Sequence, residues 1–227
     1  MKQVIPNRFL FRFAFAAGYR KPVKTAKPLG ADYRLAGFSG MDGLTDFAEV
    51  RLAWHEGGIT VEWIIPDKSQ PIYGEEDRPN ACDGMTFWID TRDSRSSHRA
   101  TRYCHQFHFL AHDGTDGGKP AVLQRPIHRA LEDAPHTSLS HVDIQRWNVD
   151  ADGEPSLTPQ RRQPSAYCMQ VTLPATAMHG YEPDANSKLG FCYRIRDKEM
   201  GDQILAAGME FPFWEDPSLW SVLELER

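Results

Sequence analysis

Hydrophobic side chains recur at every second position along much of the chain. The pattern is clearest in residues 50–54 and 59–65, which flank a turn containing Gly57 and Gly58. Alternation with a period of two places one face of a strand in a core, and two such runs joined by a tight glycine turn predict a β-hairpin. Pro66 should end the second strand, because proline has no backbone N–H to donate to a neighbouring strand.

The same alternation predicts strands at 85–90, 103–110, 167–173, 189–195 and 220–225, and a weaker pattern predicts one at 142–147. Residues 174–180 begin with proline and end with glycine, which is typical of a short helical turn. Polar loops are expected at 67–80, 91–102, 113–118 and 150–163. Because no long amphipathic helix appears, the sequence predicts an all-β fold, an antiparallel β-sandwich with one or two short helical turns.

The N-terminal segment could be taken for a secretion signal, since residues 9–17 are mostly apolar and follow two positive charges. However, Arg12 interrupts the segment, and Phe9, Phe11, Phe13 and Phe15 alternate as in a strand. We therefore predict a single domain spanning 1–227, with 1–40 forming a strand and connecting segment packed on it. Without a signal, the expected location is cytoplasmic, and no run approaches the ~18 apolar residues of a membrane helix.

Composition narrows the function classes only slightly. The net charge of −5 argues against general nucleic-acid binding through an extended positive surface. The four cysteines form no CxxC pair, which removes zinc-ribbon and thioredoxin-type sites. Cys168 and Cys192 fall on strands that we expect to be neighbours, and in a cytoplasmic protein they should be reduced.

Three segments carry a family resemblance. The strand 83–90, DGMTFWID, resembles the "DxxxFFID" strand of family-nine carbohydrate-binding modules and their DOMON-like relatives, and residues 167–197 resemble their "YxxxVxIPxxxLxGxxP…LGFxxxVxD" stretch. Residues 211–220 are similar to the family's closing "W…DPxxWGxLxL" segment. The likeness covers residues from about 42 onward and is nearest to unsecreted members of the group.

This resemblance implies a sandwich that holds a sugar between two aromatic rings, in some members with a structural calcium ion. The matching positions here are Tyr73 and Trp214 for the rings and Asp83 for an acid that opens a strand. The loop aromatic is a tyrosine where the family has tryptophan, and residues 91–112 depart from the sugar-binding members. The implied function is non-catalytic binding of a saccharide or related polar ligand.

A cluster of basic residues leaves the strand at 85–90. Arg92, Arg95, Arg99 and Arg102 lie within eleven residues, and guanidinium groups can bind a carboxylate or phosphate with two parallel hydrogen bonds. The alternative is that they pair with nearby acids. We take Arg99, Arg102 and His105 as candidate ligand-binding residues.

An enzyme site, with or without a metal, is the competing hypothesis for this cluster. His98, His105, His108 and His112 invite a metal, but His105 and His108 should point to opposite faces of their strand. Asp90 and Asp93 could offer oxygens to calcium, yet an Asx turn after the strand explains them more simply. DOMON-like cytochromes bind haem through Met and His, which would here involve Met85 or Met169. The sequence indicates no obligate cofactor.

Trp88 falls on the face of its strand opposite to Met85 and Phe87. There it either packs beneath a second layer or forms a platform for a sugar ring. Trp54 and Trp63 belong on apolar faces and are assigned to the core. A saccharide is expected at loops containing Tyr73, Trp214 and Arg102, and an interaction or scaffold protein is the third hypothesis.

Overall fold

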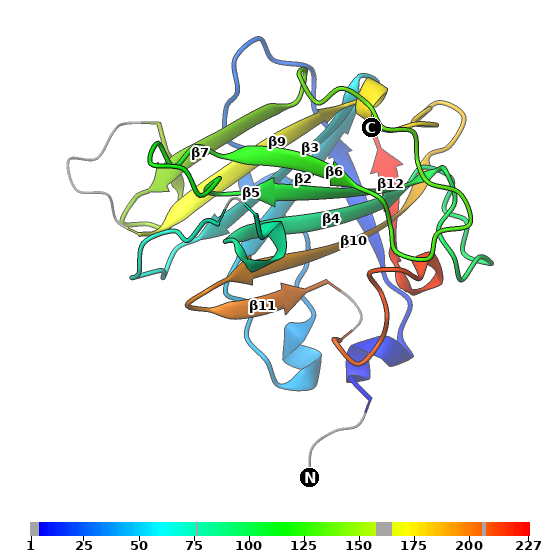
Figure 1. The fold of residues 1–227 in the computed structure, drawn as a ribbon, viewed down its shortest axis with the longest axis horizontal. Coiled ribbons are helices and arrows are strands. Elements are labelled where there is room, and N and C mark those ends of the chain that lie inside the picture. The colour runs from blue at the N-terminus through cyan, green and yellow to red at the C-terminus, as the bar shows by residue number, and fades with distance from the viewer. Residues whose placement is uncertain (1–4, 76, 158–164, 206–207) are drawn as a thin grey trace.

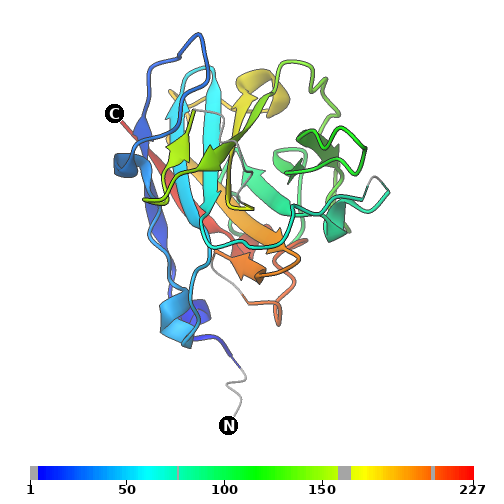
Figure 2. The same ribbon diagram turned by 90° about the vertical axis from the view of Figure 1, so that its left-hand side faces the viewer.

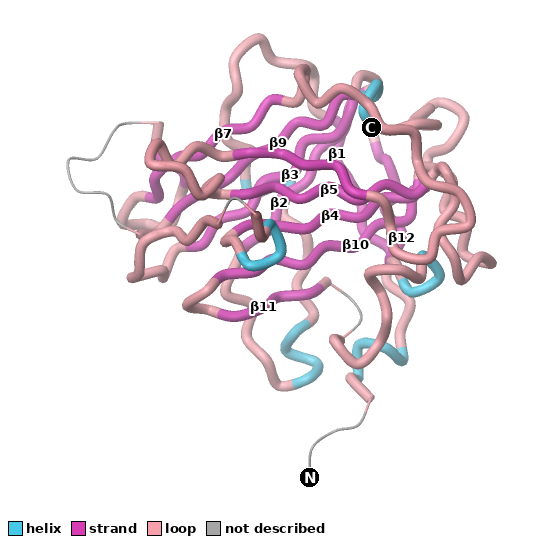
Figure 3. Tube along the Cα trace, in the orientation of Figure 1, coloured by secondary structure: helices cyan, strands magenta, loops and turns pink. Residues whose placement is uncertain are grey.

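The computed structural model describes residues 5–75, 77–157, 165–205 and 208–227. In these ranges strands dominate, and all helical segments are short 3-10 turns (Figure 3). The strands are β1 (Ala14–Tyr19), β2 (Glu49–His55), β3 (Gly58–Ile65), β4 (Gly84–Asp90), β5 (Cys104–Leu110), β6 (Ala121–Arg125), β7 (Asp143–Val149), β8 (Pro155–Ser156), β9 (Tyr167–Pro174), β10 (Lys188–Asp197), β11 (Gly201–Ile204) and β12 (Ser221–Glu226). The turns are η1 (Asn7–Leu10), η2 (Ala31–Tyr33), η3 (Ser39–Asp42), η4 (Pro79–Ala81), η5 (Ala175–Ala177) and η6 (Pro217–Leu219).

The strands form one curled sheet whose halves face each other (Figure 1). Its order is β6-β5-β4-β10-β12-β1-β2-β3-β9-β7-β8, with β11 added to β10. The front half contains β6, β5, β4, β10 and β11, and the rear half contains β1, β2, β3, β9, β7 and β8. Figure 2 shows the two halves of the sheet from the side, facing each other. The predicted β-sandwich class is confirmed.

The core is made by the side chains that alternation places between the halves. Phe87, Phe107 and Phe109 of the front half are fully buried. The Trp63 ring of β3 stacks near Phe109 of β5, with ring centroids 6.2 Å apart, so the halves meet through aromatic contacts. Trp63 and Trp54 are buried, as the sequence predicted.

The hairpin of β2 and β3 is confirmed, with His55 paired to Gly58 across the turn and β3 ending at Ile65 before Pro66. A less expected feature is the join between the halves. β12 runs antiparallel to β10 on one side and parallel to β1 on the other, and β1 is also parallel to β2. The sandwich therefore contains two parallel ladders in an otherwise antiparallel sheet.

The N-terminal prediction is correct only in part. A strand does form there, but it starts at Ala14, and Phe15 and Ala17 are its buried residues. Phe9 lies in η1 instead, where its ring stacks on Phe211 with centroids 3.7 Å apart. Phe11 is exposed. The alternating phenylalanines thus belong to two different elements, with Phe9 in η1 and Phe15 in β1.

Three strands of the described ranges were not predicted from the sequence: β6, β8 and β11. β8 falls inside the loop expected at 150–163, of which residues 158–163 lie outside the described ranges. The other predicted strands are present, and the turn expected after Pro174 is η5. None of the helices in the described ranges has the length and apolarity needed to cross a membrane.

The expectation that Cys168 and Cys192 occupy neighbouring strands is wrong. Cys168 is in β9, which pairs with β3 and β7, and Cys192 is in β10, which pairs with β4, β11 and β12. The two strands follow each other along the chain, but β9 belongs to the rear half and β10 to the front half. All four cysteines are buried.

Candidate functional site

A pocket lies on the outer face of the front half, between β4, β5 and the segment 208–216. It has a volume of about 380 Å³, which is within the usual range for small-ligand sites. We call it the tryptophan pocket and define it by six of its lining residues: Thr86, Trp88, Gln106, His108, Arg194 and Trp214.

Strand alternation explains why these side chains share a face. In β4, Phe87 and Ile89 point into the core, so Thr86 and Trp88 point outward. The register of β4 and β5 pairs Trp88 with Gln106 and Thr86 with His108. Directly paired residues project to the same side of a sheet, so four pocket residues form a compact square.

Hydrogen bonds link this square into one chain. The Trp88 Nε1–H donates to Gln106 Oε1 at 2.8 Å, which leaves the Gln106 amide nitrogen facing His108 Nε2 at 3.0 Å. An amide nitrogen only donates, so His108 Nε2 must accept and its proton sits on Nδ1. His108 Nδ1 then donates to Thr86 Oγ1 at 3.1 Å. The direction of every bond is therefore fixed by the indole N–H.

This arrangement needs a neutral His108. The ring is buried, and burial together with the nearby positive charge of Arg125 lowers the pKa of His108 to about 4. At neutral pH the imidazole therefore keeps one donor and one acceptor, as the chain of hydrogen bonds requires.

Trp214 forms the outer wall of the pocket. Trp214 is 38% exposed. Its ring packs edge-on against the Phe213 ring, with centroids 5.4 Å apart. The segment around it is held firmly: Trp220 Nε1 donates to Phe213 O at 2.7 Å, and Asp216 caps η6 by accepting the N–H of Ser218. Trp214 is thus an exposed ring on a braced segment.

Trp88 is not an open platform. Only 3% of its surface is exposed, because Phe213 packs edge-on against it with centroids 5.5 Å apart. Of the two arrangements that the sequence left open, the structure has the first: Trp88 packs beneath a second layer. Its contribution to the pocket is the inner wall and the start of the hydrogen-bond chain.

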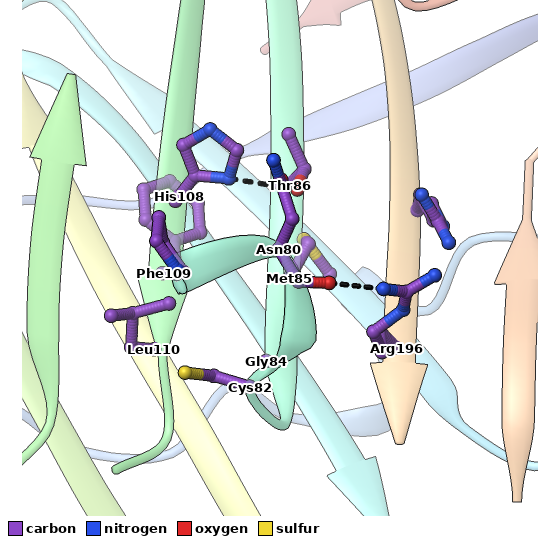
Figure 4. Close-up of a pocket in the computed structure, with 11 residues that line it drawn as sticks. Asn80, Cys82, Gly84, Met85, Thr86, His108, Phe109, Leu110 and Arg196 are labelled. Carbon is purple, nitrogen blue, oxygen red and sulfur yellow. Dashed lines mark hydrogen bonds between the residues drawn. The ribbon is translucent and has the colours of Figure 1, made fainter. Parts of the chain in front are cut away.

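A smaller hollow adjoins the tryptophan pocket and shares Thr86, His108, Arg194 and Asn80 with it (Figure 4). Its volume of about 10 Å³ suits a single water molecule. Figure 4 shows His108 hydrogen-bonded to Thr86 and, across β4, Arg196 bound to the backbone oxygen of Asn80. This hollow extends the polar end of the pocket toward β10.

Tyr73 and Asp83 lie elsewhere. Tyr73 lines a separate hollow of about 310 Å³, where Lys198 Nζ sits 3.6 Å from the centre of its ring. Asp83 is fully buried, pairs with Lys68 at 3.1 Å and accepts the backbone N–H of Tyr73 and of Lys198. These bonds give Asp83 a structural part in tying the loop to β10.

The basic cluster does not converge on one point. Arg99 donates to the backbone oxygens of Arg129 and Ala130, at 2.8 and 3.2 Å. Arg102 donates to the Tyr103 hydroxyl and lies 3.8 Å from Glu132. Neither arginine lines the tryptophan pocket or the Tyr73 hollow.

His105 belongs to the core. It has no exposed surface, its Nε2 donates to the backbone oxygen of His179 at 3.2 Å, and burial lowers its pKa to about 4. His108 points to the opposite face, as the alternation predicted. A joint site for His105 and His108 is thereby ruled out by geometry.

Metal ligation finds little support among the described residues, where no group of three or more His, Cys, Asp or Glu side chains is arranged around a common point. Asp90 instead accepts the backbone N–H of Arg92 at 2.9 Å and that of Ser94, which is the Asx turn considered from the sequence. Arg95 pairs with Asp93 at 2.7 Å.

Sequence reasoning missed Thr86, Gln106, His108 as a pocket residue, and Arg194. A signal for the first two was present, because any outward neighbour of Trp88 on β4 or β5 shares its face. Arg194 joins the site through the pairing of β10 with β4, which places it opposite Thr86.

The similarity of this chain to known proteins lies in its fold. No family model matches the sequence, and no curated protein matches it. A family-nine carbohydrate-binding module from Caldicellulosiruptor kristjanssonii, solved with cellotriose, superimposes with a TM-score of 0.58 over 94% of each chain. The fold is that of a family-nine module. The same kind of module solved with glucose gives a TM-score of 0.58, covering 94% of this chain and 96% of the other.

Sequence identity to these family-nine modules is only 11% and 10%. Such similarity establishes a shared fold, and a fold by itself does not transfer a binding site.

Proposed function

We propose that this protein is a non-catalytic domain that binds a saccharide in the tryptophan pocket. The observation that carries the proposal is the exposed ring of Trp214, which faces a row of polar side chains across a pocket of about 380 Å³. Sugars suit such a place, because their C–H faces pack on an aromatic ring while their hydroxyls bond to polar groups.

The structural neighbours support the same ligand class. Both family-nine modules named above were solved with a sugar bound, one with cellotriose and the other with glucose. The polar groups of the pocket also favour binding over catalysis, since His108 is neutral and both of its ring nitrogens are already hydrogen-bonded.

Trp214→Ala tests the proposal. Calorimetric titration of the wild-type protein with glucose and cellotriose should show saturable binding, and the variant should lose it. Because Trp214 is partly exposed and lies on a braced segment, the melting temperature should stay nearly unchanged.

Tyr73→Ala is the matched control, since it removes the other aromatic ring that the family resemblance implied. It should leave binding intact. Loss of binding in Tyr73→Ala with retention in Trp214→Ala would move the site to the Tyr73 hollow and refute the assignment. Absence of saturable binding by the wild type to any tested sugar would remove the function itself.

A further inference from the structure

The tryptophan pocket offers hydrogen-bond donors that have no acceptor. Since His108 Nδ1 donates to Thr86, the hydroxyl proton of Thr86 is left to point elsewhere. Gln106 uses one amide proton on His108 and keeps the second. Arg194 binds Asp202 through Nε and Nη2, and its Nη1 has no acceptor among the described residues. These three donors line the same pocket.

Arginine side chains lie on two sides of the tryptophan pocket. Arg125 is paired with Gln106 across β5 and β6, so its exposed side chain rises from the outer face beside the pocket. Within the described chain Arg125 has no ion-pair or hydrogen-bond partner for its guanidinium. On the opposite side, Arg194 and Arg196 share the single carboxylate of Asp202, which leaves one excess positive charge.

Acidic side chains do not offset this charge inside the pocket. No Asp or Glu is found among the described residues that line it. Glu215, the residue after Trp214, is bound by His128 at 2.8 Å and by Arg129 at 3.4 Å. The pocket is therefore rich in donors and lined by no acid, and the charge of Arg125 lies beside it.

We infer that the saccharide bound here is acidic, with a carboxylate that faces Thr86 and Arg194 while its ring packs on Trp214. This inference rests on the proposed function. A sugar hydroxyl donates and accepts with equal ease, whereas a carboxylate only accepts. Here it accepts from the Thr86 hydroxyl and from Arg194 Nη1, and it supplies the negative charge that Arg125 lacks. A uronic acid has this carboxylate on an otherwise ordinary sugar ring.

Pairs of sugars that differ only at C6 provide the test. Glucose and glucuronate, and galactose and galacturonate, are titrated into the full chain by calorimetry at about 0.02 M and about 0.5 M NaCl. The acid of at least one pair should bind about tenfold more tightly than its neutral partner at low salt. The advantage should shrink at high salt, because the rim charges are exposed.

Arg125→Gln should reduce the preference for the acid about threefold and leave binding of the neutral sugar unchanged. Arg12→Gln is the control, because it makes the same charge change at an exposed arginine that lines none of the pockets. An equal loss in both variants would show general charge attraction and would overturn the inference.

Two further outcomes distinguish this inference from the proposed saccharide-binding function. Equal affinity for the acid and neutral sugars would overturn the acidic-ligand inference and leave saccharide binding in place. Binding of neither kind of sugar would overturn both.

Discussion

The buried carboxylate of Glu62 should make the protein less stable as the pH rises. Glu62 has no exposed surface. Its Oε2 accepts hydrogen bonds from the backbone N–H of Leu29 at 3.0 Å and from Gln170 at 2.8 Å. Its Oε1 has no hydrogen-bond partner and lies 3.7 Å from Arg51. Burial outweighs these interactions and raises the pKa of Glu62 to about 7.

The sign and size follow from proton linkage. The pKa of Glu62 in the unfolded chain is 4.5, so the folded protein holds a proton that the unfolded chain releases between pH 4.5 and about 7. The stabilising contribution is complete below pH 4.5 and is lost as the pH rises through about 7. A rise of roughly 2.5 pKa units corresponds to about 3 kcal/mol.

Glu62→Gln keeps the shape of the protonated acid and removes this titration. Urea unfolding followed by tryptophan fluorescence should give nearly equal stabilities for wild type and variant near pH 5. The variant should gain on the wild type by about 3 kcal/mol at pH 8.5. Glu154→Gln is the control, because it also removes an acid paired with Arg51, at 2.8 Å, but from a side chain that is 54% exposed.

The result that would refute this reasoning is a gap between wild type and Glu62→Gln that stays constant from pH 5 to 8.5. A gap that grows equally in Glu154→Gln would assign the effect to Arg51 instead.

Two other substitutions test how the fold around the site is stabilised. Lys68→Met removes a buried ammonium group that lies 3.1 Å from Asp83 and 2.9 Å from Asp197. Urea unfolding should show a loss of about 3–5 kcal/mol in the free energy of unfolding, and a loss below about 1 kcal/mol would mean that the two carboxylates do not depend on Lys68. Phe9→Ala removes the stack on Phe211 and should lower the free energy of unfolding by about 1 kcal/mol in the same assay. Leu10→Ala is the control, because Leu10 is 69% exposed, and it should change stability very little. Equal losses in the two variants would show that the stack makes no specific contribution.

The sequence predicted the strands whose two faces differ strongly in hydrophobicity. It did not predict the strands whose two faces are similar. β6 is short, lies between Pro120 and Pro126, and has partly buried residues on both faces, so no alternation stands out. β11 has only four residues and owes its place to pairing with β10. Local pattern was sufficient for β4 and β5 because one face of each is packed with aromatic rings.

Strand order was harder to predict, and the error over Cys168 and Cys192 shows why. Two strands that follow each other usually pair, yet after β9 the turn η5 carries the chain across to the other half of the sandwich. No feature of the segment between them encodes which edge β10 will join, because that choice depends on β4 and β12.

Only two residues of the tryptophan pocket were proposed as site residues from the sequence. Trp88 and Trp214 were both singled out, and the structure places them in one pocket. Tyr73 and Arg102, expected beside Trp214, lie apart from it. No local pattern places Trp214, because its position is set by Phe213 packing on Trp88 and by the hydrogen bond from Trp220 Nε1 to Phe213 O.

The position of β12 between β10 and β1 has a consequence for how the protein is made. Residues 221–226 are the last described strand to be synthesised, yet they alone connect the front half to the rear half through the sheet. During translation the two halves can each form hairpins, but the edges of β10 and β1 remain uncovered until these residues emerge from the ribosome. Chains that stop before residue 221 should therefore expose the unpaired edges of β10 and β1 and aggregate, even though every residue of the tryptophan pocket is already present.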